Sequence, residues 1–146
     1  MGLLDVLKGD SVYLDTAPII YYVENILPYA DLLEPVFQEI EAGRLRAITA
    51  TMTLTETLVV PYRKKDWEII KKLETLLINT SGLTILSLTP EIAREAAIIR
   101  SGSSVKTPDA IQLATARDNG IDYFLTNDKR LNFLPFPQII LLDDFI

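Results

Sequence analysis

The sequence has no cysteine and no histidine among its 146 residues. Without cysteine, disulfide bonds, thiolate zinc sites and thiol nucleophiles are excluded. Without histidine, serine triads with a histidine base, histidine-bound metals and imidazole acid–base chemistry are excluded. If the chain is an enzyme, its carboxylates are therefore the expected chemical groups.

Long uncharged apolar runs and a net positive charge are also missing. No uncharged apolar stretch reaches the roughly 18 residues that span a bilayer, so we expect a soluble, cytoplasmic protein without a membrane segment. The 14 Lys and Arg residues are outnumbered by 20 Asp and Glu residues, which gives a formal net charge of −6. A nucleic-acid partner would therefore need a local basic patch or a bound metal ion.

Hydrophobic residues, in contrast, make up 49 % of the chain. This content and the length predict one folded domain, residues 1–146, with a substantial core. Five β-rich runs are expected to be strands, at residues 11–14, 45–50, 83–88, 121–126 and 138–142. Gly43, Gly82 and Gly120 each follow a helical pattern and precede one of these runs, as glycines at the ends of helices do.

Helical patterns fill the segments between these strands. Helices are expected at residues 18–24, 28–41, 53–62, 66–79 and 91–100, and from residue 107 onward. Thr53 and Glu56 form a capping-box pattern, and Thr89 and Thr107 are expected N-caps because each precedes a proline and an acid. Strands that alternate with helices predict an α/β fold with a mostly parallel sheet covered on both faces.

Four acidic residues are expected at the carboxyl edge of this sheet, where ligands collect in such folds. Asp15 ends the first strand and Asp128 follows the fourth. Glu56 lies in the expected first turn of the helix after the second strand. Asp109 lies in the first turn of a helix that follows another helix, and the loop at residues 101–106 is long enough to return the chain to this edge.

Position alone does not select these four, because it also places Glu91, Asp143 and Asp144 near the same edge. Simpler roles exist as well: Glu56 as the capping-box acid, Asp109 as a dipole acid and Asp128 as a turn residue. The simpler role is favoured for Glu91, Asp143 and Asp144. Asp15 is different, because it lies in a strongly apolar run where a carboxylate needs a partner.

Four converging carboxylates would repel one another unless a cation lay between them. Mg²⁺ and Mn²⁺ prefer oxygen ligands and are commonly held by carboxylates together with phosphate oxygens. The chemistry that fits is metal-assisted hydrolysis of phosphodiester bonds, which requires no histidine.

Four short motifs, in this order, resemble the PIN-domain nucleases, and among them the VapC-type toxin ribonucleases. The resemblance covers nearly the whole chain and rests on Leu14-Asp15-Thr16, Thr53-Leu54-Thr55-Glu56-Thr57-Leu58, Thr107-Pro108-Asp109-Ala110-Ile111-Gln112-Leu113-Ala114 and Leu125-Thr126-Asn127-Asp128-Lys129-Arg130-Leu131. It implies a three-layer α/β/α sandwich around a central, mostly parallel sheet of about five strands.

The resemblance also implies an Mg²⁺- or Mn²⁺-dependent endoribonuclease, a cognate antitoxin that blocks the acidic site, and commonly a homodimer. Its catalytic and metal-binding quartet corresponds to Asp15, Glu56, Asp109 and Asp128, and Thr126 to a supporting hydroxyl. The chain departs from the family at Arg130-Leu131, where members often have Asp-Phe. A fifth carboxylate is therefore missing, which puts a second metal in question.

Residues 63–72 are the most basic segment, and Arg63, Lys64 and Lys65 are candidate RNA contacts. Trp67 could stack on a base but is expected to pack in the core instead, and the segment can equally be the solvated face of a helix. Arg100 and Lys106 flank the loop before Asp109 and are weaker candidates. The alternative function is a non-catalytic PIN-like module that binds RNA or a protein, with its acids acting as caps.

Overall fold

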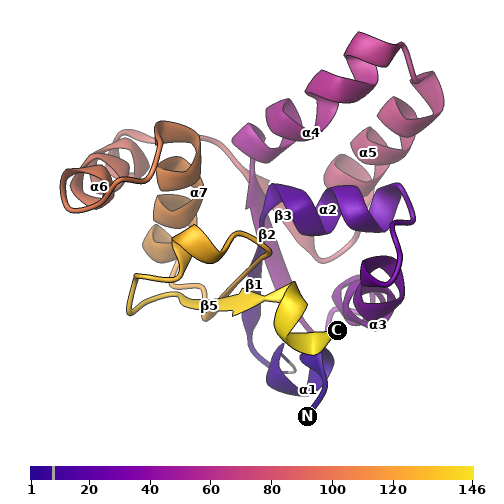
Figure 1. The fold of residues 1–146 in the computed structure, drawn as a ribbon, viewed down its shortest axis with the longest axis horizontal. Coiled ribbons are helices and arrows are strands. Elements are labelled where there is room, and N and C mark those ends of the chain that lie inside the picture. Colours follow the sequence, from indigo (N-terminus) through magenta and orange to yellow (C-terminus); the bar gives the residue numbers. More distant parts are fainter. Residues whose placement is uncertain (8) are drawn as a thin grey trace.

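Five parallel strands form the centre of the molecule, in the spatial order β3-β2-β1-β4-β5 (Figure 1). They are β1 (Ser11–Leu14), β2 (Arg46–Ala50), β3 (Leu83–Leu86), β4 (Tyr123–Thr126) and β5 (Gln138–Leu141). This computed structural model describes residues 1–7 and 9–146. All five expected strands are present, and every pairing is parallel; Val12, for example, pairs with Ala47 on one side and Tyr123 on the other.

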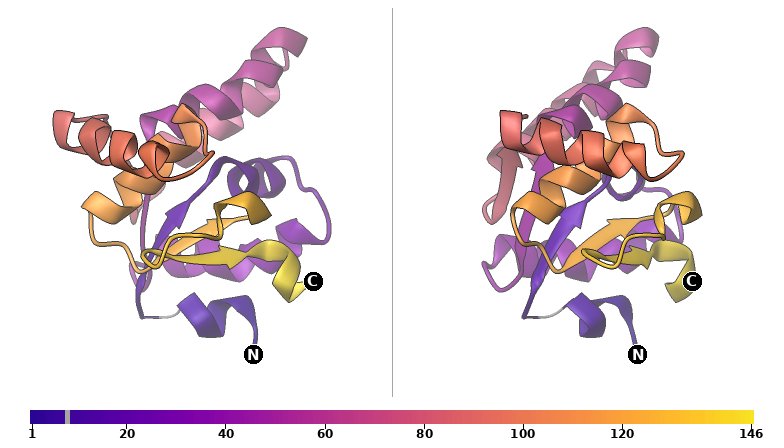
Figure 2. Two further views of the ribbon diagram at one scale, coloured as in Figure 1. Left: turned by 60° about the vertical axis from the view of Figure 1, so that its left-hand side comes forward. Right: turned by 90° about the vertical axis from the view of Figure 1, so that its left-hand side faces the viewer.

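Helices cover both faces of the sheet (Figures 1 and 2). The helices are α1 (Leu3–Leu7), α2 (Thr16–Val23), α3 (Tyr29–Glu41), α4 (Thr51–Lys64), α5 (Trp67–Asn79), α6 (Pro90–Ser101) and α7 (Thr107–Asp118). Two 3₁₀ turns, η1 (Lys129–Leu131) and η2 (Leu142–Phe145), follow β4 and β5. Helices α4 and α5 form a hairpin that projects beyond the sheet. Among the described residues, no helix has both the length and the apolar character to cross a bilayer.

Two separate hydrophobic clusters fill the space between the layers. Val12 and Leu14 of β1 pack in the cluster with α1, α2, α3 and α5, whereas Tyr13 packs in the cluster with α6 and α7. This alternation is the period of two that a strand with both faces buried requires. The expected three-layer α/β/α architecture is therefore confirmed.

The expected N-caps are only partly correct. Thr89 Oγ1 accepts a hydrogen bond from the Ile92 amide at 3.1 Å, as expected. Helix α4, however, begins at Thr51, so Thr53 is not its cap and Glu56 lies in its second turn. Lys106, not Thr107, is the N-cap of α7, because Thr107 is already the first residue of the helix; Thr107 Oγ1 accepts from Arg100 Nη1.

Gly82 and Gly43 both adopt positive φ, at +85° and +76°, but differ in their surroundings. A Cβ atom on Gly82 would lie 2.1 Å from the backbone oxygen of Ile40, whereas a Cβ atom on Gly43 would meet nothing within 4 Å. The turn before β3 therefore approaches α3 more closely than any side chain allows.

We expect Gly82→Ala to lower the free energy of unfolding by about 3 kcal/mol, the sum of the positive-φ penalty and a backbone displacement. Gly43→Ala is the matched control and should lower it by only about 1 kcal/mol. Urea unfolding of both variants measures the difference. Equal losses in the two variants would contradict the close approach at Gly82.

Candidate active site

The chain reverses its direction of travel across the sheet at β1, because β2 and β3 lie on one side of it and β4 and β5 on the other. In parallel α/β sheets, ligands bind outside the carboxyl ends of the strands at such a switch point. Asp15 follows β1 and Asp128 follows β4, so the two carboxylates lie on either side of this point.

Asp15 is fixed by two hydrogen bonds and is only 6 % exposed. Its Oδ1 accepts from the Thr16 amide at 2.8 Å, and its Oδ2 accepts from Thr126 Oγ1 at 2.6 Å. The Thr126 hydroxyl also accepts from the Asp128 amide at 3.1 Å. Thr126 thus links the ends of β1 and β4 and orients the first acid.

Glu56 is held by a buried polar network centred on Gln112. Its Oε1 accepts from Gln112 Nε2 at 2.6 Å and from Thr16 Oγ1 at 3.1 Å. The opposite end of the Gln112 amide accepts from Tyr13 at 3.0 Å and from Thr53 at 2.9 Å. Because Gln112, Tyr13 and Thr53 are at most 1 % exposed, this network is shielded from water and positions Glu56 rigidly.

Asp128 is engaged by the neighbouring Arg130. The Arg130 guanidinium donates from Nη2 to Oδ2 at 2.7 Å and from Nε to Oδ1 at 3.0 Å. These bonds hold the pKa of Asp128 below its usual range. Arg130 stands where the resemblance implied an acid. It pairs instead with Asp128, the last of the four acids in the sequence.

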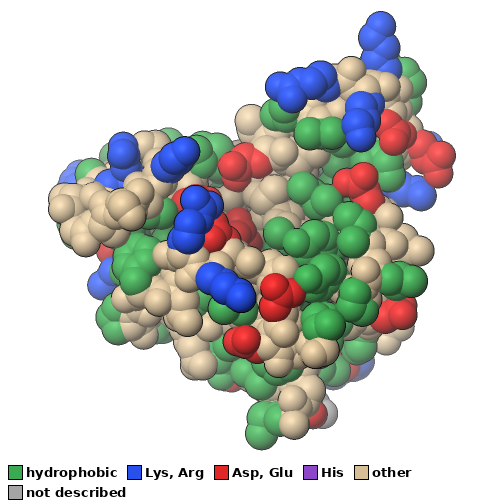
Figure 3. Space-filling view, in the orientation of Figure 1, with side chains coloured by type: hydrophobic (Ala, Val, Ile, Leu, Met, Phe, Trp, Pro, Cys, Tyr) green, Lys and Arg blue, Asp and Glu red, His purple; other side chains and the backbone are tan. Residues whose placement is uncertain are grey.

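All four acids, together with Thr126, line one cavity of about 370 Å³. Glu91, Asp143 and Asp144 do not line it. Figure 3 shows acidic side chains in the notch between the α6–α7 pair and the α4–α5 hairpin, with basic side chains beside them. Four segments that are distant in the sequence thus converge on one site, as the strand ends predict.

Three of the four carboxyl groups in this cavity have raised pKa values. Burial raises the pKa of Asp15 to about 6, although hydrogen bonds from Thr126 and Thr16 oppose the shift. Burial also raises the pKa of Glu56 and of Asp109, and each is raised further by a neighbouring carboxylate, Asp109 in the first case and Asp128 in the second. A cation in the cavity would relieve this repulsion.

The donor set suits a hard divalent cation such as Mg²⁺ or Mn²⁺, because every candidate ligand is a carboxylate oxygen. Among the described residues, however, no three acidic side chains are close enough to form a finished metal cage. The bonds of Glu56 to Gln112 and of Asp128 to Arg130 explain the spacing. Asp15, Glu56, Asp109 and Asp128 are the residues that would hold such an ion.

Sequence reasoning missed Gln112, the residue that positions Glu56. A signal was present, because Gln112 lies three residues after Asp109, on the same side of a helix. The side chain is long enough to donate at one end and accept at the other. A polar residue on the sheet-facing side of a helix, next to a candidate acid, is the pattern that indicates such a role.

The basic segment lies at the far end of the α4–α5 hairpin, away from the acids. Arg63, Lys64 and Lys65 are exposed and do not line the acidic cavity. At 1.5 Å per residue, Lys64 lies about 12 Å further along α4 than Glu56. The expectation that Trp67 packs in the core is wrong: the residue is 63 % exposed, and its ring forms a T-shaped pair with that of Tyr62, at a centroid separation of 6.2 Å.

Comparisons with known proteins agree with this architecture. The family model described as PIN domain matches residues 12–136. No curated protein sequence matches the chain significantly. Among solved structures, the VapBC2 complex of Rickettsia felis bound to a promoter DNA fragment matches with a TM-score of 0.70 and 17 % identity, over 90 % of this chain and 98 % of the other.

Two further structures give similar values. A toxin–antitoxin complex from Klebsiella pneumoniae matches with a TM-score of 0.64 and 20 % identity, over 90 % of this chain and 97 % of the other. VapC20 of Mycobacterium tuberculosis, described as a sarcin-ricin loop cleaving toxin, matches with a TM-score of 0.62 and 13 % identity, over 77 % and 86 %. At these identities the likeness is one of fold.

Proposed function

This chain belongs to the PIN domain family, and we propose that it is a metal-dependent endoribonuclease that hydrolyses RNA phosphodiester bonds. The observation that supports this most is the convergence of Asp15, Glu56, Asp109 and Asp128 on one cavity at the switch point of the sheet. Phosphodiester hydrolysis needs a charge-rich site that activates water and stabilises a leaving oxygen, and a bound Mg²⁺ or Mn²⁺ supplies both.

The residues around the cavity would have two roles, orienting the carboxylates and binding the metal ion. Thr126 and Thr16 orient the Asp15 carboxylate, and Gln112 and Thr16 orient that of Glu56. Asp109 and Asp128 complete the set of metal ligands. Burial of Asp15 excludes water from one side of the site, which strengthens every electrostatic interaction there.

We further propose that the protein acts as the toxin of a toxin–antitoxin pair, in the cytoplasm and as a homodimer. The support is the structurally similar protein from Klebsiella pneumoniae, which is described as a toxin–antitoxin complex. RNA is the proposed substrate because the structurally similar VapC20 is described as a sarcin-ricin loop cleaving toxin. Arg63, Lys64 and Lys65 would then contact phosphates at a distance from the acids.

The alternative of a non-catalytic PIN-like binding module has two observations in its favour. Asp128 is already paired with Arg130, and the described acids form no finished cage. A module of this kind would use its acids in hydrogen bonds and need no metal ion.

Incubation of the purified protein with a pool of structured RNAs, in Mg²⁺, Mn²⁺ or EDTA, separates the two. We expect RNA fragments with either metal ion and none with EDTA. A protein that leaves the pool intact in both metals, while a control nuclease cuts it, would contradict the proposed activity and favour the binding module.

A further inference from the structure

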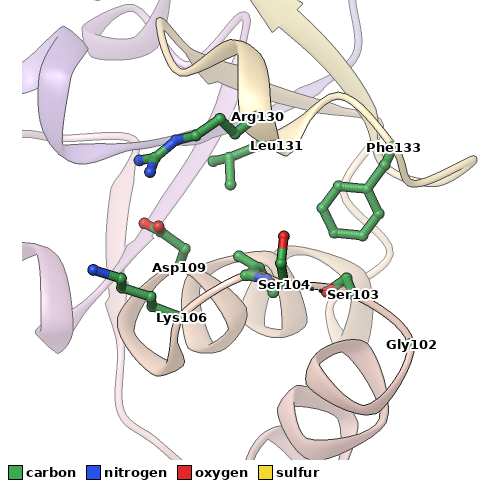
Figure 4. A pocket seen from close by; sticks show the side chains of 9 residues that line it. Gly102, Ser103, Ser104, Lys106, Asp109, Arg130, Leu131 and Phe133 are labelled. Carbon is green, nitrogen blue, oxygen red and sulfur yellow. Dashed lines mark hydrogen bonds between the residues drawn. The ribbon is translucent and has the colours of Figure 1, made fainter.

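A second cavity, of about 350 Å³, opens beside the acidic one (Figure 4). The two cavities share Asp109, so a ligand could pass from one into the other. The second cavity is lined by the loop between α6 and α7 and by the first turn of α7. Its opposite wall comes from η1 and from Phe133, two residues after η1 ends. No role has so far been assigned to this space.

One end of the second cavity carries charges of both signs. Lys106 and Arg130 flank Asp109 there (Figure 4). Among the described residues, no carboxylate lies within salt-bridge distance of the Lys106 ammonium, although its charge acts on Asp109 and opposes the rise in the pKa of that carboxyl. Arg130 pairs with Asp128 of the acidic cavity and thus bridges the two spaces.

The other end offers an aromatic face and a hydroxyl. Phe133 lies opposite the charged end, with Ser104 between (Figure 4). Phe133 is 44 % exposed, so its ring is accessible to a ligand in the cavity. Leu131, which is buried, adds an apolar side chain to the lining.

The loop that lines this cavity is braced rather than loose. Arg100 donates from Nε to the Val105 carbonyl at 3.1 Å and from Nη1 to Thr107 Oγ1 at 2.9 Å. Ser103 Oγ donates to the Ile99 carbonyl at 2.8 Å. The cavity wall is therefore preformed, as small-ligand sites usually are.

We propose that the second cavity binds the nucleotide next to the scissile phosphate, with the phosphate of that nucleotide at Lys106 and its base stacked on Phe133. The inference rests on the proposed nuclease function and deepens it. A cation without a salt-bridge partner and a single aromatic ring, separated by a hydroxyl, match the charged and flat ends of a single-stranded nucleotide. Stacking accepts any base, whereas Ser104 can donate to or accept from a base edge.

Binding of a fluorescently labelled single-stranded RNA to the Asp15→Asn protein tests this without cleavage. We expect Phe133→Leu to weaken binding roughly 5- to 20-fold, within the range for loss of one stacked base. Lys106→Gln should weaken it several-fold and reduce the slope of log affinity against log salt by about one phosphate contact. The matched controls, Phe136→Leu and Arg94→Gln, remove an exposed ring and an exposed charge outside the cavity and should change binding by less than about twofold.

An RNA series with one abasic site at successive positions adds a second readout. One position should weaken binding to the parent protein, and Phe133→Leu should remove that dependence because the two changes delete the same contact. The subsite proposal is overturned if Phe133→Leu binds RNA as Phe136→Leu does, if no abasic position depends on Phe133, or if RNA does not bind at all.

Cleavage of RNA by the wild type in Mn²⁺ is measured separately. If the wild type cleaves RNA but Phe133→Leu binds RNA as well as the parent protein does, only the subsite proposal is wrong. If Phe133→Leu weakens binding but the wild type does not cleave RNA, only the proposed catalytic activity is wrong.

Discussion

Asp15→Asn should reduce RNA cleavage by more than about a hundredfold while the protein remains folded, because a neutral amide neither attracts a cation nor stabilises developing charge as a carboxylate does. Asn has nearly the shape of Asp, and its Oδ1 can still accept from the Thr16 amide. Initial rates in Mg²⁺ and in Mn²⁺ give the comparison. Asp144→Asn is the matched control, since Asp144 is exposed and does not line the cavity, and it should cleave at the wild-type rate.

The same substitution should make the metal-free protein more stable at neutral pH. The pKa of Asp15 is about 6 in the folded protein and 3.8 for a free group, so the folded state prefers the protonated form. Stability contributed by that form is present below pH 4 and is lost as the pH rises from about 4 to about 6, by roughly 3 kcal/mol. Asn escapes this loss but weakens the bond to Thr126, at a cost of about 1 kcal/mol.

Urea unfolding in EDTA at pH 4 and pH 7.5 measures this effect. We expect Asp15→Asn to exceed the wild type by about 2 kcal/mol at pH 7.5 and to lose that advantage at pH 4. Mn²⁺ should stabilise the wild type more than the variant. Near-normal cleavage by Asp15→Asn, or a variant less stable than the wild type at pH 7.5, would show that Asp15 is a structural carboxylate.

The strand ends were the part of the site that sequence could predict. Asp15 and Asp128 each follow a β-rich run, and parallel strands bring such positions to one edge whatever the details of packing. The prediction for Asp109 required only that the loop before it be long enough to return the chain to that edge. These predictions depend on chain direction and reach, which short sequence patterns specify well.

The hydrogen-bond and packing partners of individual side chains were harder to predict from the sequence, because they depend on contacts between distant segments. Thr53 looks like a helix cap, but burial turns its hydroxyl toward Gln112, 59 residues later. Trp67 looks like a core residue, yet the α4–α5 hairpin projects beyond the sheet and leaves it without a partner layer. Arg130 reads as a missing acid in the sequence, and only the structure shows it bound to Asp128.

Gln112→Met should damage both stability and catalysis, although methionine nearly matches glutamine in length. The hydroxyls of Tyr13 and Thr53 would lose their buried acceptor, and Glu56 would lose a donor at 2.6 Å. We expect the free energy of unfolding to fall by about 3 kcal/mol and kcat to fall tenfold or more, with little change in KM. Urea unfolding and steady-state kinetics on one RNA substrate measure the two effects.

A lower kcat alone would not distinguish positioning of Glu56 from general weakening of the fold, but the pH–rate profile does. The Gln112 hydrogen bond lowers the pKa of Glu56, so its removal should raise that pKa and move the acidic limb of the profile to higher pH. Thr115→Val is the matched control, since it removes a buried hydrogen bond on the same helix, to the Ile111 carbonyl, without touching Glu56. It should cost about 1 kcal/mol and leave the profile in place. If Gln112→Met also leaves the acidic limb unmoved, the amide serves packing alone, and Glu56 must be oriented by Thr16.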